Sequence, residues 1–388
     1  MNKIFGFSEN DLIRLGAIHT ATEIYQQPNL WTEVFEIIKN NETRLKKLKQ
    51  NIDSINNLRI VLTGAGTSAY IGDTAEGYLK SLLNKRIESI PTTDIVCNPN
   101  QHIEKQTSTI LVSFARSGNS PESVGVYDLF DRLCDDVTQI IITCNENGEL
   151  AKKALKSDKN IVILMPKKSN DKSFAMTSSF TCMLLTSLLI FDIENLHSKR
   201  NLINKIASNG QTILEREWEK IQYLSNEDIQ RVVYVGSGCL KGLTREASLK
   251  NLELTSGKII SVCESILGFR HGPKSIIDEK TLVIMFASQN DYTRLYDSDL
   301  AKEIFHDKGE HKLWIISNDS FECFDKNSYK YSVIDKGYIP EAFVALNYIL
   351  FAQIFALMNS IKLGISPDSP RPDGTVNRVV KGVKIYNF

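Results

Sequence analysis

Apolar residues in this chain form short continuous runs that alternate with helix-like periodic segments. Seven runs are rich in β-branched residues, at 59–63, 108–114, 137–144, 160–165, 231–235, 281–286 and 311–318. Continuous runs of this length are typical of strands buried on both faces of a parallel sheet. Because turns and amphipathic segments separate the runs, the pattern predicts an α/β fold.

The N-terminal segment, 1–56, is helical in pattern. Ser8 and the acidic residues after it can open one helix, the periodicity of 20–26 ends at Pro28, and 32–49 form a second amphipathic segment. We expect these helices to pack against the main body.

The strand runs repeat along the chain. The stretch from Arg59 to Gly66 matches the stretch from Arg231 to Gly238 at an offset of 172, and 109–115 match 281–287 at the same offset. A third pair, ending at Asn145 and Asn318, is offset by 173. We therefore predict two copies of one βα unit, joined by a long helix. The expected segments are 1–56 (N-terminal helices), 57–200 (first copy), 201–228 (linker helix), 229–365 (second copy) and 366–388 (a tail over the active site).

Composition narrows the function classes. Lys+Arg and Asp+Glu are both 46 in 388 residues, which argues against a broad nucleic-acid or membrane-binding surface. The seven scattered cysteines fit reduced thiols in the cytoplasm and give no zinc spacing, and the N-terminus lacks the apolar run of a signal peptide. The apolar stretches 180–191 and 342–357 are expected to be buried helices rather than membrane spans.

Two loops of the first copy are suited to binding an anion. Gly66, Thr67 and Ser68 follow one strand and open a helix; Arg116, Ser117 and Ser120 do the same after the next strand. Thr177 and Ser178 open a further apolar helix, as caps or as pocket lining. The first loop also satisfies a loose dinucleotide pattern, G-x-G-x-x-A, but the acidic residue expected about 20 positions later is missing. A nucleotide-binding dehydrogenase is therefore a distant alternative.

The second copy carries acid and base groups instead. Glu246, Lys250 and Glu253 would project from one face of a helix, and His271 lies in a compact turn further along the chain. Such groups can move protons on a small polar substrate. Taken alone, they also fit an ordinary surface ion pair and a histidine that caps a loop. In the proline-rich tail, Lys381 could reach a pocket, or the tail could simply be a solvated basic end.

Together these residues resemble the sugar isomerase (SIS) family, in particular its members with two tandem SIS domains. The loops at 66–68 and 116–120 resemble the SIS phosphate loops. The residues Glu246, Lys250 and Glu253, the turn 271–273, the tail around Lys381 and the segment 23–28 resemble the isomerase half of glucosamine-6-phosphate synthase. Residues 177–181 and 374–380 look most similar to AgaS-type proteins, described as tagatose-6-phosphate ketose/aldose isomerases or galactosamine-6-phosphate deaminases. Arg116 replaces a neutral amide of the synthase, and Ser178 replaces a lysine.

The resemblance implies a fold and a set of roles. The fold would be two tandem three-layer αβα domains, each with a parallel sheet, plus N-terminal helices. Glu253 would be the base acting at C1 and C2. Lys250 and Lys381 would orient the reacting oxygens or nitrogen, and Glu246 would hold Lys250. His271 would open the sugar ring and come from the neighbouring subunit of a homodimer. Gly66, Thr67, Ser68, Ser117 and Ser120 would bind phosphate, with Arg116 as an electrostatic partner, and Thr177 and Ser178 would line the pocket.

The expected function is interconversion of an aldose and a ketose 6-phosphate through an enediol-like intermediate, with no metal or organic cofactor required. The expected partners are a phosphorylated hexose or hexosamine and a second copy of the chain. A deaminase that releases ammonia remains open, and so does a non-catalytic sugar-phosphate sensor. A sensor would keep the phosphate loops but could dispense with Glu253 and His271.

Overall fold

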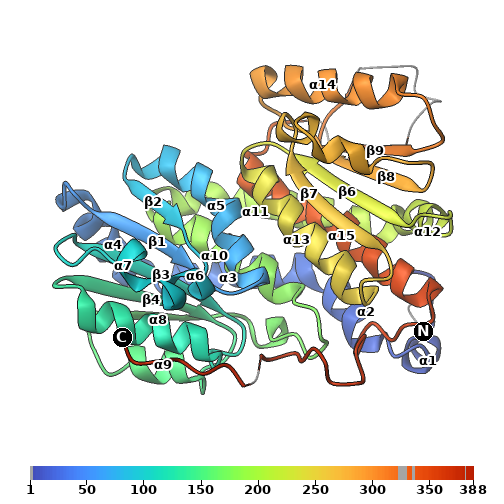
Figure 1. Cartoon of the computed structure of the whole chain (residues 1–388). Coiled ribbons are helices and arrows are strands. Elements are labelled where there is room, and N and C mark those ends of the chain that lie inside the picture. Colours follow the sequence, from blue (N-terminus) through green and yellow to red (C-terminus); the bar gives the residue numbers. More distant parts are fainter. Residues whose placement is uncertain (1–2, 322–329, 334–336, 381) are drawn as a thin grey trace. The chain divides into compact units, whose positions relative to one another are not determined.

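The computed structural model of the chain describes residues 3–321, 330–333, 337–380 and 382–388. It contains two five-stranded parallel sheets flanked by helices (Figure 1), as the sequence predicts. The chain forms two compact units. The first-sheet unit comprises Asn29–Lys172, Met176–Asn204 and Arg371–Phe388, and the second-sheet unit comprises Met1–Pro28, Ser173–Ala175 and Lys205–Pro370.

The first sheet has the strand order β2-β1-β3-β4-β5. Its strands are β1 (Arg59–Thr63), β2 (Arg86–Ser89), β3 (Thr109–Ala115), β4 (Val137–Thr143) and β5 (Ile161–Leu164). Every residue of β1 and β3 is buried, which explains their continuous apolar runs. All pairs are parallel, so the carboxyl ends of β1 and β3 lie side by side at one edge of the sheet.

Helices cover the first sheet, and two of their boundaries differ from the predicted ones. They are α3 (Gln27–Asn40), α4 (Glu42–Ser54), α5 (Thr67–Leu83), α6 (Thr92–Cys97), α7 (Pro99–His102), α8 (Pro121–Leu133), α9 (Glu149–Ala154), η1 (Lys167–Ser169), α10 (Ser178–Phe191), η2 (Ile193–Asn195) and the first part of α11 (Leu196–Arg216). The segment predicted as one helix over 32–49 breaks at Asn41, a poor helix former that lies at the start of α4. Pro28 begins rather than ends a helix, because it occupies the first turn of α3, where no backbone N–H is needed.

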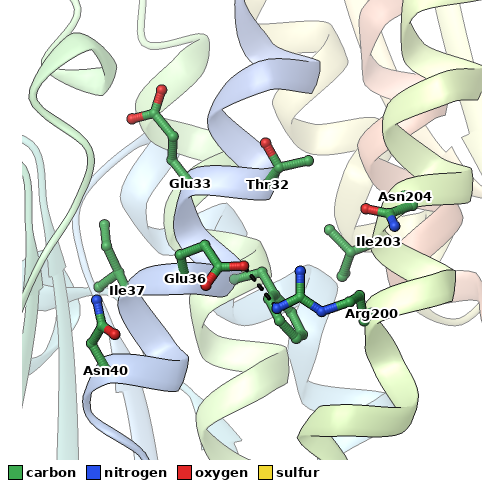
Figure 2. Close-up of a pocket in the computed structure, with 9 residues that line it drawn as sticks. Thr32, Glu33, Glu36, Ile37, Asn40, Arg200, Ile203 and Asn204 are labelled. Carbon is green, nitrogen blue, oxygen red and sulfur yellow. Dashed lines mark hydrogen bonds and ion pairs between the residues drawn. The ribbon is translucent and has the colours of Figure 1, made fainter.

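A hollow of about 480 Å³ lies between α3 and α11 in the first-sheet unit (Figure 2). Arg200 crosses it, with its guanidinium 2.8 Å from the Glu36 carboxylate and 4.5 Å from the centre of the Phe35 ring. The residues that line the hollow are Thr32, Glu33, Phe35, Glu36, Ile37, Asn40, Arg200, Ile203 and Asn204. It shares no residue with the sites predicted from the sequence.

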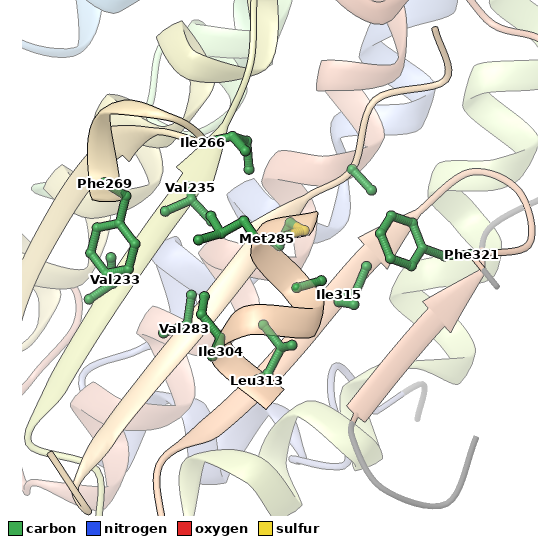
Figure 3. Packing of buried hydrophobic residues seen from close by; sticks show 13 residues of the cluster. Val233, Val235, Ile266, Phe269, Val283, Met285, Ile304, Leu313, Ile315 and Phe321 are labelled. Atoms are coloured by element: carbon green, nitrogen blue, oxygen red, sulfur yellow. The ribbon is translucent and has the colours of Figure 1, made fainter. Parts of the chain in front are cut away.

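The second sheet has the order β10-β9-β8-β6-β7 and is also parallel. Its strands are β6 (Arg231–Gly236), β7 (Ile260–Ser265), β8 (Thr281–Phe286), β9 (Lys312–Ser317) and β10 (Lys330–Val333). One face packs into an apolar cluster that includes Val233, Val283, Met285, Ile304 and Ile315 (Figure 3). The repeat seen in the sequence is therefore a repeat of sheets, with β6 and β8 in the positions of β1 and β3.

The helices of the second-sheet unit are α1 (Glu9–Arg14), α2 (Ile18–Tyr25), the rest of α11, α12 (Trp218–Ser225), α13 (Cys239–Leu254), η3 (Gly268–Arg270), η4 (Pro273–Ile276), α14 (Asp291–His306) and α15 (Glu341–Lys362). The prediction of a single linker helix over 201–228 is wrong, because α11 ends at Arg216 and α12 begins at Trp218. By length and composition α15 could cross a membrane, but 94% of its apolar window is buried inside the structure. The prediction that 342–357 form a buried helix is confirmed.

The tail ties down the start of the chain. The carboxylate of Asp368 accepts hydrogen bonds from the backbone N–H groups of His19 (3.1 Å) and Thr20 (2.7 Å) at the first turn of α2. The hydroxyl of Ser366 donates to the Gly16 carbonyl at 2.9 Å. A carboxylate at a helix N-terminus satisfies N–H groups that the helix leaves unpaired. Asp368 therefore serves as the cap that Ala17, the residue before α2, does not provide.

Candidate functional site

The first predicted anion loop is a sharp glycine turn between β1 and α5. Gly66 has φ 56° and ψ −127°, a conformation that favours glycine, and α5 begins at the next residue. A Cβ on Gly64 would lie 2.6 Å from the backbone of Ser68, so this position also excludes a side chain. Thr67 and Ser68 are buried in the first turn of α5. Backbone N–H groups and two hydroxyls therefore gather at a helix start, as anion binding requires.

The second loop follows β3, the neighbour of β1. Gly118 turns it with φ 66°, and the amide of Asn145 donates to the Ser117 carbonyl at 2.8 Å. Ser120 precedes α8, and its hydroxyl donates to Ser123 at 2.7 Å. Since β1 and β3 end at the same edge, the two loops are neighbours within the first-sheet unit. The geometry agrees with a phosphate cradle, and the binding roles of these residues stay a prediction.

Arg116 has a partner that the sequence did not reveal. It is only 6% exposed, and its Nη2 donates to the backbone carbonyl of Arg378 at 2.7 Å. The Nε of Arg378 in turn donates to the carbonyl of Asp171 at 3.0 Å. The second loop is thus fastened to the C-terminal tail.

The predicted acid/base residues all lie on α13. Lys250 and Glu246 are fully buried, and the Lys250 ammonium lies 3.4 Å from the Glu246 carboxylate. The ammonium also donates a hydrogen bond to Glu253, whose side chain is 22% exposed. Burial alone would lower the pKa of Lys250, but the two carboxylates outweigh it and the pKa is raised. An ordinary surface ion pair is therefore excluded: this is a buried ammonium that presents one accessible carboxylate.

Of the two remaining predicted residues, the structure describes only His271. His271 follows η3, is exposed, and makes a backbone N–H bond to Gly268 at 3.0 Å. Gly272, with φ 117°, turns the chain into η4. Lys381 lies outside the described residues. Among the residues that are described, no group of three or more His, Cys, Asp or Glu side chains is arranged to hold a metal ion.

Comparison with known proteins identifies the family to which this chain belongs. Residues 55–191 match the SIS domain family. The D-galactosamine-6-phosphate deaminase AgaS of Shewanella sp. ANA-3 is 40% identical over 98% of this chain and 95% of its own length. The chain belongs to the AgaS-type family of SIS-domain proteins. A crystal structure of a Clostridium novyi NT protein superposes on this AgaS-type chain with TM-score 0.97 and 43% identity over 100% of both. The crystal structure of tagatose-6-phosphate ketose/aldose isomerase from Escherichia coli superposes with a TM-score of 0.88. It is 36% identical over 95% of this chain and 96% of its own.

One buried carboxylate of this AgaS-type chain escaped the sequence analysis. The backbone N–H groups of Thr177, Ser178 and Ser179 donate to the carboxylate of Asp171 at 3.0, 3.0 and 2.9 Å. All four residues are buried, so Thr177 and Ser178 sit in the capped start of α10. Asp171 precedes Thr177 by more than the spacing of an ordinary N-cap, and this separation hid it from the sequence. The pocket-lining role of Thr177 and Ser178 stays a prediction.

Proposed function

We propose that this chain is a sugar-phosphate aldose/ketose isomerase that acts on a hexose or hexosamine 6-phosphate. The observation that carries the proposal is the α13 cluster: Lys250 is fully buried and charged, and it holds Glu253, whose carboxylate solvent can still reach. Burying an ammonium costs several kcal/mol of folding free energy unless anions pair with it, and here Glu246 and Glu253 do so. A non-catalytic sensor has no use for such a cluster.

In the proposed reaction, Glu253 accepts the proton from C2 of the open-chain aldose and returns a proton to C1. The electron pair left at carbon forms an enediol-like intermediate, and a proton moves between the O1 and O2 oxygens to complete the ketose. Lys250 orients the Glu253 carboxylate and offsets negative charge that develops nearby. Glu246 keeps Lys250 charged and in place. We assign ring opening to His271 and orientation of the reacting groups to Lys381.

The first-copy loops would hold the substrate by its phosphate. Gly66 makes the turn that exposes backbone N–H groups, while Thr67, Ser68, Ser117 and Ser120 supply hydroxyls. Binding a non-reacting phosphate positions the carbon that reacts, which raises the rate without new chemistry. Arg116 would add positive charge behind the loop while it holds the tail.

The substrate follows from the relatives, which are named as a D-galactosamine-6-phosphate deaminase and a tagatose-6-phosphate ketose/aldose isomerase. We favour a galacto-configured sugar for that reason. A deaminase uses the same proton transfer on a 2-amino sugar to give an imine at C2, and water then hydrolyses the imine to the ketose and ammonia. The deciding experiment incubates the protein with galactosamine 6-phosphate and assays free ammonia and ketose product. Ammonia release selects deamination, ketose formation only from aldose phosphates without an amine selects simple isomerisation, and neither product from any of these sugars would refute the proposal.

We also propose that the protein is a cytoplasmic homodimer in which His271 serves the partner's substrate. The exposed position of His271 supports this arrangement. Light scattering would measure the mass, and mixing Glu253→Gln with His271→Ala subunits would test the sharing. If His271 acts in the partner, each mixed dimer contains one intact site of two. Because random exchange makes about half of the dimers mixed, the sample recovers about a quarter of wild-type activity. No recovery from exchanged dimers would assign His271 to its own subunit.

A further inference from the structure

The second-sheet unit keeps the backbone of an anion loop. Gly238 has φ 54° and ψ −127°, against 56° and −127° for Gly66 in the first copy. Each glycine directly precedes a long helix, α13 or α5. A Cβ on Gly236 would lie 2.9 Å from the Leu240 carbonyl oxygen, just as one on Gly64 would meet Ser68. The glycine cradle is therefore duplicated, although the residues that follow it are Cys239 and Leu240 instead of hydroxyls.

A carboxylate of the protein itself lies against this second cradle. Glu341, the first residue of α15, accepts a hydrogen bond from the hydroxyl of Ser288. Its other carboxylate oxygen lies 3.5 Å from the point that a Cβ on Gly238 would occupy. In the sequence repeat, Ser288 and Gly238 are the equivalents of Arg116 and Gly66. The Glu341 carboxylate therefore bonds the counterpart of one phosphate loop and lies beside the glycine turn of the other. The backbone N–H of Ser288 is also occupied, because it donates to Asp297 at 2.7 Å.

The first copy differs at the corresponding position. There α10 packs on α5, as α15 packs on α13 in the second copy, and α10 begins with Ser178 rather than an acid. The first residue of α10 is thus a serine whose N–H donates to Asp171, whereas the first residue of α15 is itself the carboxylate that accepts from Ser288. The Glu341 carboxylate occupies the Ser288 hydroxyl, and its negative charge repels a phosphate that approaches the second cradle.

We propose that the second-sheet unit retains an oxyanion cradle and that the Glu341 carboxylate is its built-in anion. Glu341 closes the second cradle to phosphate, so each chain takes one phosphorylated substrate, through the first-copy loops. Asp297 reinforces the closure by holding the Ser288 N–H. The contrast between the copies rests on the proposed phosphate role of Ser68 and Ser117, whereas the closure by Glu341 does not.

The test removes the internal anion in a chain that lacks the first site. Ser68→Ala/Ser117→Ala provides the background. Glu341→Ser with Asp297→Asn removes both negative charges from the second cradle and gives the opened variant, and Asp297→Asn alone is the matched control. The unfolding midpoint of each is followed against inorganic phosphate up to about 20 mM, with chloride at equal ionic strength. The opened variant should gain a phosphate-dependent rise of about 2–4 °C that the background and the control lack. A folded opened variant without that rise overturns the proposal.

The wild-type protein gives a second measurement that needs no opened variant. Because Glu341 closes the second cradle, phosphate should stabilise the wild type only through the first loops, and the Ser68→Ala/Ser117→Ala background should lose all of this effect. Saturable stabilisation that survives in the background would mean that the second cradle is open, against the proposal. If phosphate does not stabilise the wild type, the proposed phosphate role of the first loops is wrong. Stabilisation of the opened variant by phosphate would still support closure by Glu341 in that case.

Discussion

The guanidinium of Arg116 donates a 2.7 Å hydrogen bond to the backbone carbonyl of Arg378, 262 residues later in the chain. Arg378 also donates to the carbonyl of Asp171, so the tail is held at two points within the first-sheet unit. The donors are cations, which makes such bonds stronger than neutral ones. The loop predicted to bind phosphate and the tail that carries Lys381 are therefore mechanically linked.

Replacing Arg116 should release the tail. Loss of a hydrogen bond from a charged donor costs about 1.5 kcal/mol or more, so Arg116→Ala should expose the tail about ten times more often. Trypsin cleavage at Lys384, followed by mass spectrometry, should accelerate by about that factor, because cleavage follows the open population. Arg132→Ala, an exposed arginine on α8 of the same unit, is the control. Equal cleavage of both variants and the wild type would show that Arg116 does not restrain the tail.

Glu253→Gln should fold and bind substrate but turn over at least about 100-fold more slowly, because the amide cannot accept the carbon-bound proton. Lys250 keeps Glu246 as an ionic partner, so the unfolding midpoint should change little. Turnover and equilibrium sugar-phosphate binding are measured together, with the exposed Glu279→Gln of the same unit as control. Near wild-type turnover in Glu253→Gln would remove this residue from the mechanism.

Ser117→Ala should weaken substrate binding and leave the chemical step almost unchanged. The hydroxyl is expected to bond a charged phosphate oxygen, and losing such a bond costs about 1.5–3 kcal/mol, or at least a tenfold rise in KM. Steady-state kinetics measure this, and Ser157→Ala, at an exposed site in the same unit, is the control. A large fall in kcat at unchanged KM would assign Ser117 to the chemistry instead.

Asp297 should make stability depend on pH. Burial raises its pKa to about 6, against the hydrogen bond from Ser288 and the positive charge of Arg294, while Glu341 adds to the rise. The folded state therefore keeps a proton that the unfolded state has released, and stability falls as pH rises from about 4 to about 6. Asp297→Asn should remove this fall and gain up to about 3 kcal/mol at pH 7. Urea unfolding at pH 4, 5, 6 and 7 compares the two proteins, and parallel pH profiles would contradict the assignment.

The central strands of both sheets were predictable because they are buried on both faces. β1, β3, β6 and β8 are continuous apolar runs, and only such runs identify a strand without any periodicity. The edge strands β2 and β7 were missed. β2 reads Arg-Ile-Glu-Ser and β7 is only partly buried, so neither is apolar enough to stand out from a loop.

Some residues of the candidate site were likewise predictable from the sequence, and others were not. Glycines and hydroxyls that directly follow a strand identified the loops at Gly66 and Ser117, because a local signal was enough. Asp171 and Glu341 act through partners brought together by the fold: Arg378 is 207 residues from Asp171, and Ser288 is 53 from Glu341. No local pattern encodes those distances. The sequence also left Lys250 open between a surface ion pair and a proton-transfer group, and only the structure shows that it is buried.

The contact of Asp368 with the start of α2 has a consequence for synthesis. The N–H groups of His19 and Thr20 leave the ribosome early, and their acceptor follows 348 residues after Thr20. The second-sheet unit also takes in residues up to Pro28, although its sheet begins only at Arg231. Domains generally fold as units while the chain grows. Here the first-sheet unit has most of its chain early, whereas the first two helices must wait for almost the whole protein before their final partners exist.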